Sequence, residues 1–123
     1  MTAHPPPRGA SGDRERLVAQ LATTDDQIRQ LRGQHGEIVA ASRDSNADDE
    51  HDPEGSTIAF ERQQVAALIT ALQATRHDID RALVALDQGT YGVCEGCGRP
   101  IGAQRLQARP SASPCIDCAS RRR

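Results

Sequence analysis

The chain has 123 residues, of which 26% are charged and 2% are aromatic, and its formal net charge is −2. So few large apolar side chains exclude a conventional globular core, but they suit long amphipathic helices packed through Leu, Ile, Val and Ala. No run of about 18 apolar residues occurs, so no membrane-spanning segment is predicted.

The N-terminal part of the chain is predicted to be a disordered leader followed by a helix. Residues 1–12 contain a run of prolines and almost nothing apolar to pack, which favours disorder. A helical pattern starts at about Asp13. Its apolar positions recur in alternating steps of four and three, at Leu17, Leu21, Ile28, Leu31 and Ile38, with Thr24 and His35 between them. Gly33 and Gly36 each weaken the helix by about 1 kcal/mol relative to Ala, so its last turns are expected to fray or bend.

A second helix is predicted from Pro53 to Gln88. Its apolar residues recur every seven positions, at Ile58, Val65, Leu72, Ile79 and Leu86, and Leu68, Ile69, Ala82 and Leu83 widen the same stripe. Asp52, Pro53 and Glu54 form a good helix start, with an N-cap acid, a proline in the first helical position and an acid in the first turn. Gly89 is a good stop signal.

The two helices predict a mainly α fold, an antiparallel coiled-coil hairpin over residues 13–89. A helix of this length, about 54 Å, needs a partner for its narrow apolar stripe, and the first helix offers one. The connection is acidic: residues 44–54 contain six carboxylates and neither Lys nor Arg. We expect this segment to form the tip of the hairpin, about 40–50 Å from the residues that follow the second helix.

The only four cysteines form two CxxC pairs, Cys94/Cys97 and Cys115/Cys118, separated by 17 residues. This spacing is typical of a closed four-thiolate site for one structural zinc ion, so residues 90–119 are predicted to be a zinc finger and residues 120–123 a basic tail. Gly98 suits the positive φ that such a turn often needs. The alternatives are two disulfides or a redox dithiol. Disulfides would require an oxidising compartment, and the sequence shows no apolar signal segment, so a cytoplasmic location is expected.

The finger sequence resembles the DksA/TraR regulators of bacterial RNA polymerase. The resemblance rests on the stretch from Tyr91 to Ile101, on residues 105–110 and on the second CxxC pair, and covers residues 48–119 in all. It implies a two-helix coiled coil set on a four-cysteine finger. Family members insert the coiled coil into the secondary channel of the polymerase and change promoter-complex kinetics, often together with the nucleotide ppGpp.

The resemblance also implies site residues and partners. Asp49 and Asp52 match the two aspartates of the family's Asp-x-x-Asp-x-Ala tip, Glu54 stands in place of the alanine, and Asp48 adds a carboxylate. RNA polymerase is the implied partner and ppGpp a candidate ligand, with Arg76, Arg81 and the terminal arginines as candidate contacts by location. A monomer is expected, with no membrane contact and no specific DNA contact.

Other functional classes fit the sequence less well. A nucleic-acid binder would use Arg99, Arg105, Arg109 and the basic tail to neutralise phosphates, but it lacks aromatic stacking residues. A redox sensor would lose zinc when its thiolates are oxidised, and this role could coexist with regulation. No catalytic Ser/His/Asp or Cys/His set is evident, so the chain is not expected to be an enzyme.

Overall fold

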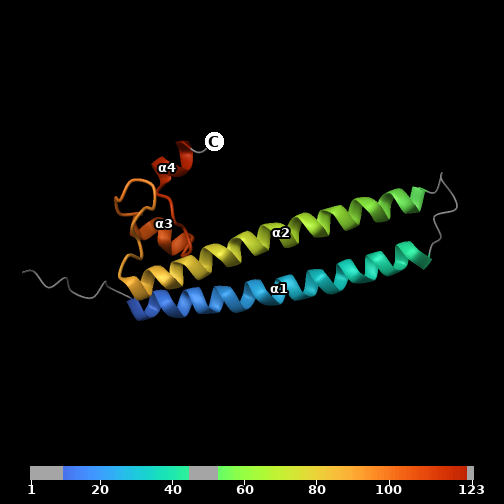
Figure 1. Cartoon of the computed structure of the whole chain (residues 1–123), viewed down its shortest axis with the longest axis horizontal. Helices are drawn as coiled ribbons and strands as arrows, with labels where there is room; N and C mark the ends of the chain where they lie inside the picture. The colour runs from blue at the N-terminus through green and yellow to red at the C-terminus, as the bar shows by residue number, and fades with distance from the viewer. Residues whose placement is uncertain (1–9, 45–52, 122–123) are drawn as a thin grey trace, which may run out of the picture. The chain divides into compact units, whose positions relative to one another are not determined.

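The computed structural model describes residues 10–44 and 53–121 and is mainly helical (Figure 1). Its elements are α1 (Ala10–Asp44), α2 (Pro53–Gln88), α3 (Ala103–Ala108) and α4 (Ile116–Arg121). Among the described residues, the only β-type pairing is an isolated antiparallel bridge between Val93 and Pro100. Neither α1 nor α2, nor the two short helices within these ranges, is long and apolar enough to cross a membrane.

The chain divides into two compact units. The first unit contains residues 1–22 and 75–123, and the second unit contains residues 23–74. In each unit a segment of α1 runs antiparallel to a segment of α2, as Figure 1 shows. This arrangement confirms the predicted helical hairpin, and the first unit also contains the cysteine-rich segment.

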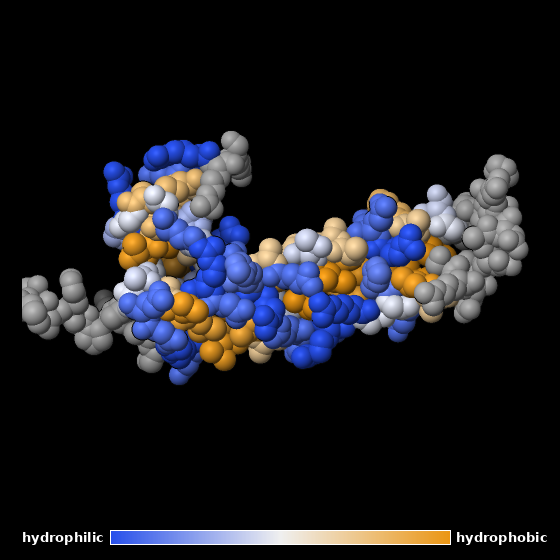
Figure 2. Space-filling model, in the orientation of Figure 1, coloured by the Kyte–Doolittle hydropathy of each residue, from blue (hydrophilic) through white to orange (hydrophobic). Residues whose placement is uncertain are grey.

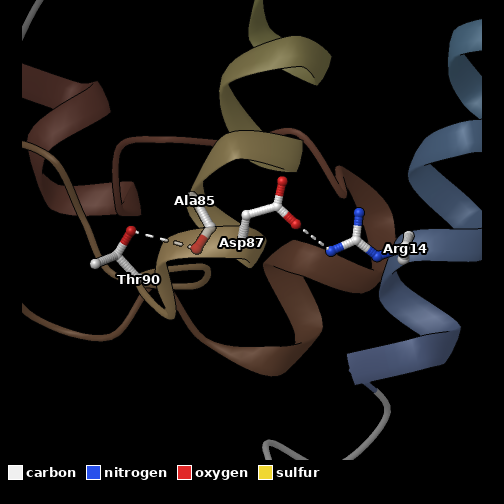
Figure 3. Close-up of polar contacts among 4 residues, drawn as sticks. All are labelled: Arg14, Ala85, Asp87 and Thr90. Carbon is white, nitrogen blue, oxygen red and sulfur yellow. Dashed lines mark hydrogen bonds and ion pairs between the residues drawn. The ribbon is translucent and has the colours of Figure 1, made fainter.

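The apolar core of the first unit lies along the predicted stripe. Leu17 and Ile79 are fully buried and pack with Ala82. Leu21, Leu83, Leu86 and Tyr91 pack around these three residues. At the edge of this core, the guanidinium of Arg14 donates to the carboxylate of Asp87 at 2.6 Å, and the two side chains point toward each other from α1 and α2 (Figure 3). Both groups are about half exposed or more, so this ion pair adds at most about 1 kcal/mol.

α2 ends in a Schellman motif. Gly89 has a φ of 75°, the left-handed conformation that glycine adopts without strain. The backbone N–H of Gly89 donates to the carbonyl of Leu86 at 3.2 Å, and that of Thr90 donates to Ala85 at 2.8 Å. The Thr90 hydroxyl donates a hydrogen bond to the same Ala85 carbonyl at 3.4 Å (Figure 3). These bonds end the helix at the predicted residue and turn the chain toward the cysteines.

In the second unit, one prediction about the buried stripe is wrong. Thr24, Ile28 and Val65 are buried, whereas Leu68, expected to widen the stripe, is 53% exposed. The neighbouring Ile69 is half-buried in its place. Leu68 lies three residues after Val65 and Ile69 lies four residues after it, and this part of α2 turns the second of these positions inward.

Helix boundaries agree with the sequence except at the start of α1. α2 spans Pro53–Gln88 as predicted, but α1 begins at Ala10, so residues 10–12 of the expected leader are helical. The helix also continues past Gly33 and Gly36 to Asp44 without a break. The rest of the expected leader, residues 1–9, lies outside the described residues, as do residues 45–52 of the expected tip.

Candidate metal centre

A second small core forms around the cysteines of the first unit. Cys94, Ile101 and Cys115 are buried together, with Leu106 and Cys118 packed against them. Apart from one isoleucine and one leucine, this core consists of sulfur ligands. So little apolar burial cannot offset the entropy of ordering some thirty residues, which means that the segment needs another source of stability.

The structure brings all four predicted metal ligands to one point. The four Sγ atoms lie within 4.8 Å of one another, and those of Cys97 and Cys115 are 3.8 Å apart. Four sulfurs placed about 2.3 Å from a central zinc in tetrahedral geometry would be about 3.8 Å apart. The donor set and its spacing therefore fit a closed four-thiolate zinc site.

Backbone amides point at two of the sulfurs. The N–H groups of Gly96 and Cys115 each donate to Cys94 Sγ at 3.3 Å, and that of Cys118 donates to Cys115 Sγ at 3.4 Å. The hydrogen bond from the Cys115 amide is the main reason why the pKa of Cys94 falls to about 6. Hydrogen bonds with the other thiols raise the pKa of Cys118 to about 12, and the hydrogen bond with Cys115 makes the largest contribution. The cluster thus favours the thiolate of Cys94 and disfavours that of Cys118, and a bound cation would favour both.

Two glycines shape the first cysteine turn. Gly98 has the expected positive φ, 75°, and its N–H donates to the Cys94 carbonyl at 3.0 Å. Gly96 lies close to the second cysteine pair, because a Cβ atom there would be 3.2 Å from Cys118 Sγ, tighter than an ordinary contact. A side chain at this position would therefore push the loop or Cys118 aside by a few tenths of an ångström.

The spacer between the cysteine pairs is held by a few specific hydrogen bonds. The Tyr91 hydroxyl donates to the Pro110 carbonyl at 2.7 Å, and Arg105 Nε donates to the Pro114 carbonyl at 2.9 Å. The N–H of Glu95 donates to the carbonyl of Ser113 at 3.1 Å. These contacts join residues that are 9 to 19 positions apart in the sequence, so no local sequence pattern predicts them.

A basic cleft of about 270 Å³ opens beside the finger within the first unit. Its charged residues are Arg81, Arg105, Arg109 and Asp78. Arg81 was a predicted ligand contact, whereas the arginines from α3 and its C-cap join it only through the fold of the spacer. Arg76, the other α2 candidate, is paired with Asp80 at 3.0 Å and does not line this cleft.

Most of the predicted tip residues lie outside the residues that the structure describes. Asp48, Asp49 and Asp52 lie outside the described residues, and Glu54 is described only as part of the first turn of α2. The terminal Arg122 and Arg123 also lie outside them. The tip therefore stays a prediction.

Comparison with known proteins identifies the finger and the fold. Residues 89–123 match the family model "Prokaryotic dksA/traR C4-type zinc finger". With the clustered sulfurs, this match shows that the finger binds one structural zinc ion.

Curated relatives match between about a third and three fifths of the chain. The uncharacterised protein YteA of Bacillus subtilis is 35% identical over 75 residues, which are 61% of this chain and 31% of that protein. The RNA polymerase-binding transcription factor DksA of Haemophilus influenzae is 50% identical over 40 residues, 32% of this chain and 28% of that protein. The matched segments thus span about a third or less of these relatives.

A solved structure matches over a greater length. The transcription factor DksA2 from Pseudomonas aeruginosa superposes with a TM-score of 0.72 at 26% identity, covering 92% of this chain and 81% of that one. The similarity therefore extends from the finger to the long helices.

Proposed function

We propose that the chain is a bacterial transcription regulator of the DksA/TraR family that binds RNA polymerase. The observation that carries this proposal is the structural match over 92% of the chain to a transcription factor of the same family. The four-cysteine cluster adds a family-specific feature at the matching end. A fold alone does not define a function, so the proposal rests on this fold together with this finger.

In this proposal Cys94, Cys97, Cys115 and Cys118 are the four zinc ligands. Their sulfurs have the spacing of a tetrahedral thiolate site, which leaves no open position for a substrate. Bound zinc would supply the electrostatic centre that holds four thiolates together. Its role is structural, and the chain's effect on transcription comes from where it binds and not from chemistry of its own.

The acidic segment between α1 and α2 is the proposed effector. We place it in the secondary channel, near the polymerase active centre, where Asp49 and Asp52 would accept hydrogen bonds from the polymerase or share a Mg²⁺ ion as hard oxygen ligands. Glu54 keeps a carboxylate where the best-known relatives have a small apolar residue. Asp52 would also cap α2, whose first helical residue is Pro53.

The basic cleft beside the finger is the proposed site for ppGpp. Arg81, Arg105 and Arg109 line it, and guanidinium groups bind phosphates through paired hydrogen bonds. Arg109 is the best-suited of the three, since its side chain makes no hydrogen bond or ion pair with residues 10–44 or 53–121. Arg105 already donates to Pro114, and Arg81 is paired with Glu95.

The test of the effector role is the lifetime of open promoter complexes at a ribosomal-type promoter. The Asp52→Asn variant should bind polymerase as the wild type does. It should change the lifetime of the open complex much less than the wild type does. Losing one charged hydrogen bond costs about 1.5–3 kcal/mol, a tenfold or larger change in a kinetic step. Asn is nearly as good an N-cap, so the start of α2 should survive.

The matched control is Glu15→Gln, which removes an exposed carboxylate from α1 in the first unit. It should act as the wild type does. Equal effects of Asp52→Asn and wild type would refute the tip mechanism while leaving polymerase binding intact. For the cleft, Arg109→Ala should lower the ppGpp dependence of the effect, and an unchanged dependence would reject that site.

A further inference from the structure

The first unit contains two separate small cores, one between the long helices and one around the cysteines. One side chain, that of Tyr91, contacts both the first core and the segment that carries the second. Tyr91 packs against the hairpin core of Leu17, Ile79 and Ala82. Its hydroxyl donates to the Pro110 carbonyl, in the spacer between the two cysteine pairs, at 2.7 Å. Desolvation by burial raises the pKa of this phenol, which keeps it a neutral donor. Tyr91 is thus fixed by the helices on one side and by the finger on the other.

A second contact joins α2 to the finger. Arg81, next to the buried Ala82, forms an ion pair with Glu95. Glu95 directly follows Cys94, and its N–H donates to the Ser113 carbonyl at 3.1 Å, two residues before Cys115. This glutamate therefore lies where both cysteine-bearing segments meet. The pair is partly exposed, so it contributes less than the packing of Tyr91.

The chain between Tyr91 and the first cysteine leaves little freedom for independent motion. The N–H of Ile101 donates to the Gly92 carbonyl at 2.8 Å, and Val93 forms the isolated bridge with Pro100. Ile101 is itself buried against Cys94 and Cys115. A shift of Tyr91 out of the hairpin core would therefore disturb the backbone that positions the cysteines.

From these contacts we infer that zinc binding by the finger and the packing of α1 against α2 in the first unit are energetically linked, with Tyr91 and Arg81 as the connecting side chains. Zinc orders the spacer, and the ordered spacer presents the Pro110 carbonyl and the Glu95 carboxylate to the two connecting residues. The linkage is reciprocal: the factor by which bound zinc favours the packed helices equals the factor by which the packed helices favour zinc binding. It does not depend on polymerase binding.

The experiment measures zinc affinity of the full chain by competition with a chromogenic chelator. Leu17→Ala removes a fully buried side chain from α1, which carries none of the cysteines. We expect it to weaken zinc binding about five- to tenfold, at the lower end of typical coupling between sites. Tyr91→Phe, which keeps the ring but loses the hydrogen bond, and Arg81→Gln should each weaken it by a smaller factor. Leu68→Ala, an exposed leucine of the second unit, is the matched control and should leave the affinity unchanged.

A second measurement covers the case in which Leu17→Ala does not fold. Hydrogen exchange of the wild type is followed with zinc and after its removal by chelator. The amides of residues 14–21 and 79–86 should exchange several-fold faster without zinc, while those of residues 58–72 should change little. Unchanged exchange in residues 14–21, or an unchanged zinc affinity in folded Leu17→Ala and Tyr91→Phe, would overturn the linkage.

Discussion

Truncating Ile79 to Ala tests the helix packing most sharply. Ile79 is fully buried and contacts the hairpin core through Leu17 and Ala82, so the truncation removes three side-chain carbons and leaves a cavity. Substitutions of this kind cost about 2–5 kcal/mol. The partly buried residues around the site can move into some of the space, so we expect about 3 kcal/mol. Leu68→Ala deletes a similar number of atoms from a side chain that is 53% exposed and should cost well under about 1 kcal/mol.

Both variants are compared with the wild type by urea unfolding in the presence of zinc, followed by far-UV circular dichroism. The free energy of unfolding should fall by at least about 2 kcal/mol more for Ile79→Ala than for Leu68→Ala. Similar losses for the two variants would show that the buried stripe does not follow the path described above.

Three further changes have defined outcomes. Gly33→Ala should stabilise the helix by up to about 1 kcal/mol in the same urea assay, because a Cβ there meets nothing within 4 Å, and destabilisation would contradict the exposed helical position. Gly96→Ala should weaken zinc binding severalfold in the chelator competition, because its Cβ would lie 3.2 Å from Cys118 Sγ; equal affinity would show that the loop can move away. Burial raises the pKa of Tyr91, so the unfolded chain loses the phenol proton first: the stability from neutral Tyr91 is complete below about pH 10 and is lost as the pH rises through its folded-state pKa. Tyr91→Phe should remove this part of the pH dependence of unfolding, and an unchanged pH profile would rule it out.

The features set by local sequence were the predictable ones. The heptad stripe and the signals at Pro53 and Gly89 predicted both ends of α2, because capping and periodicity act within a few residues. The paired cysteines predicted the metal site for a similar reason, since ligand spacing follows from coordination geometry. Leu68 was misplaced because the periodicity admits residues both three and four positions after Val65, and packing partly buries only the second of them.

Features that depend on the path of the spacer between the cysteine pairs could not be predicted from the sequence. Its composition, rich in turn-forming residues, does not reveal that Pro110 accepts a hydrogen bond from Tyr91 or that Arg109 joins Arg81 at one cleft. We expect these contacts to form only when the cysteines come together, because the segment has little apolar core of its own.

We propose that this chain binds RNA polymerase through the secondary channel of the enzyme. The most direct test of this proposal is the affinity of the purified, zinc-loaded chain for the RNA polymerase of its host, measured with the channel open and with the channel blocked by another channel-binding factor. We predict saturable binding that the blocking factor abolishes by competition. An absence of binding, or binding that the blocked channel leaves unchanged, would contradict the claim.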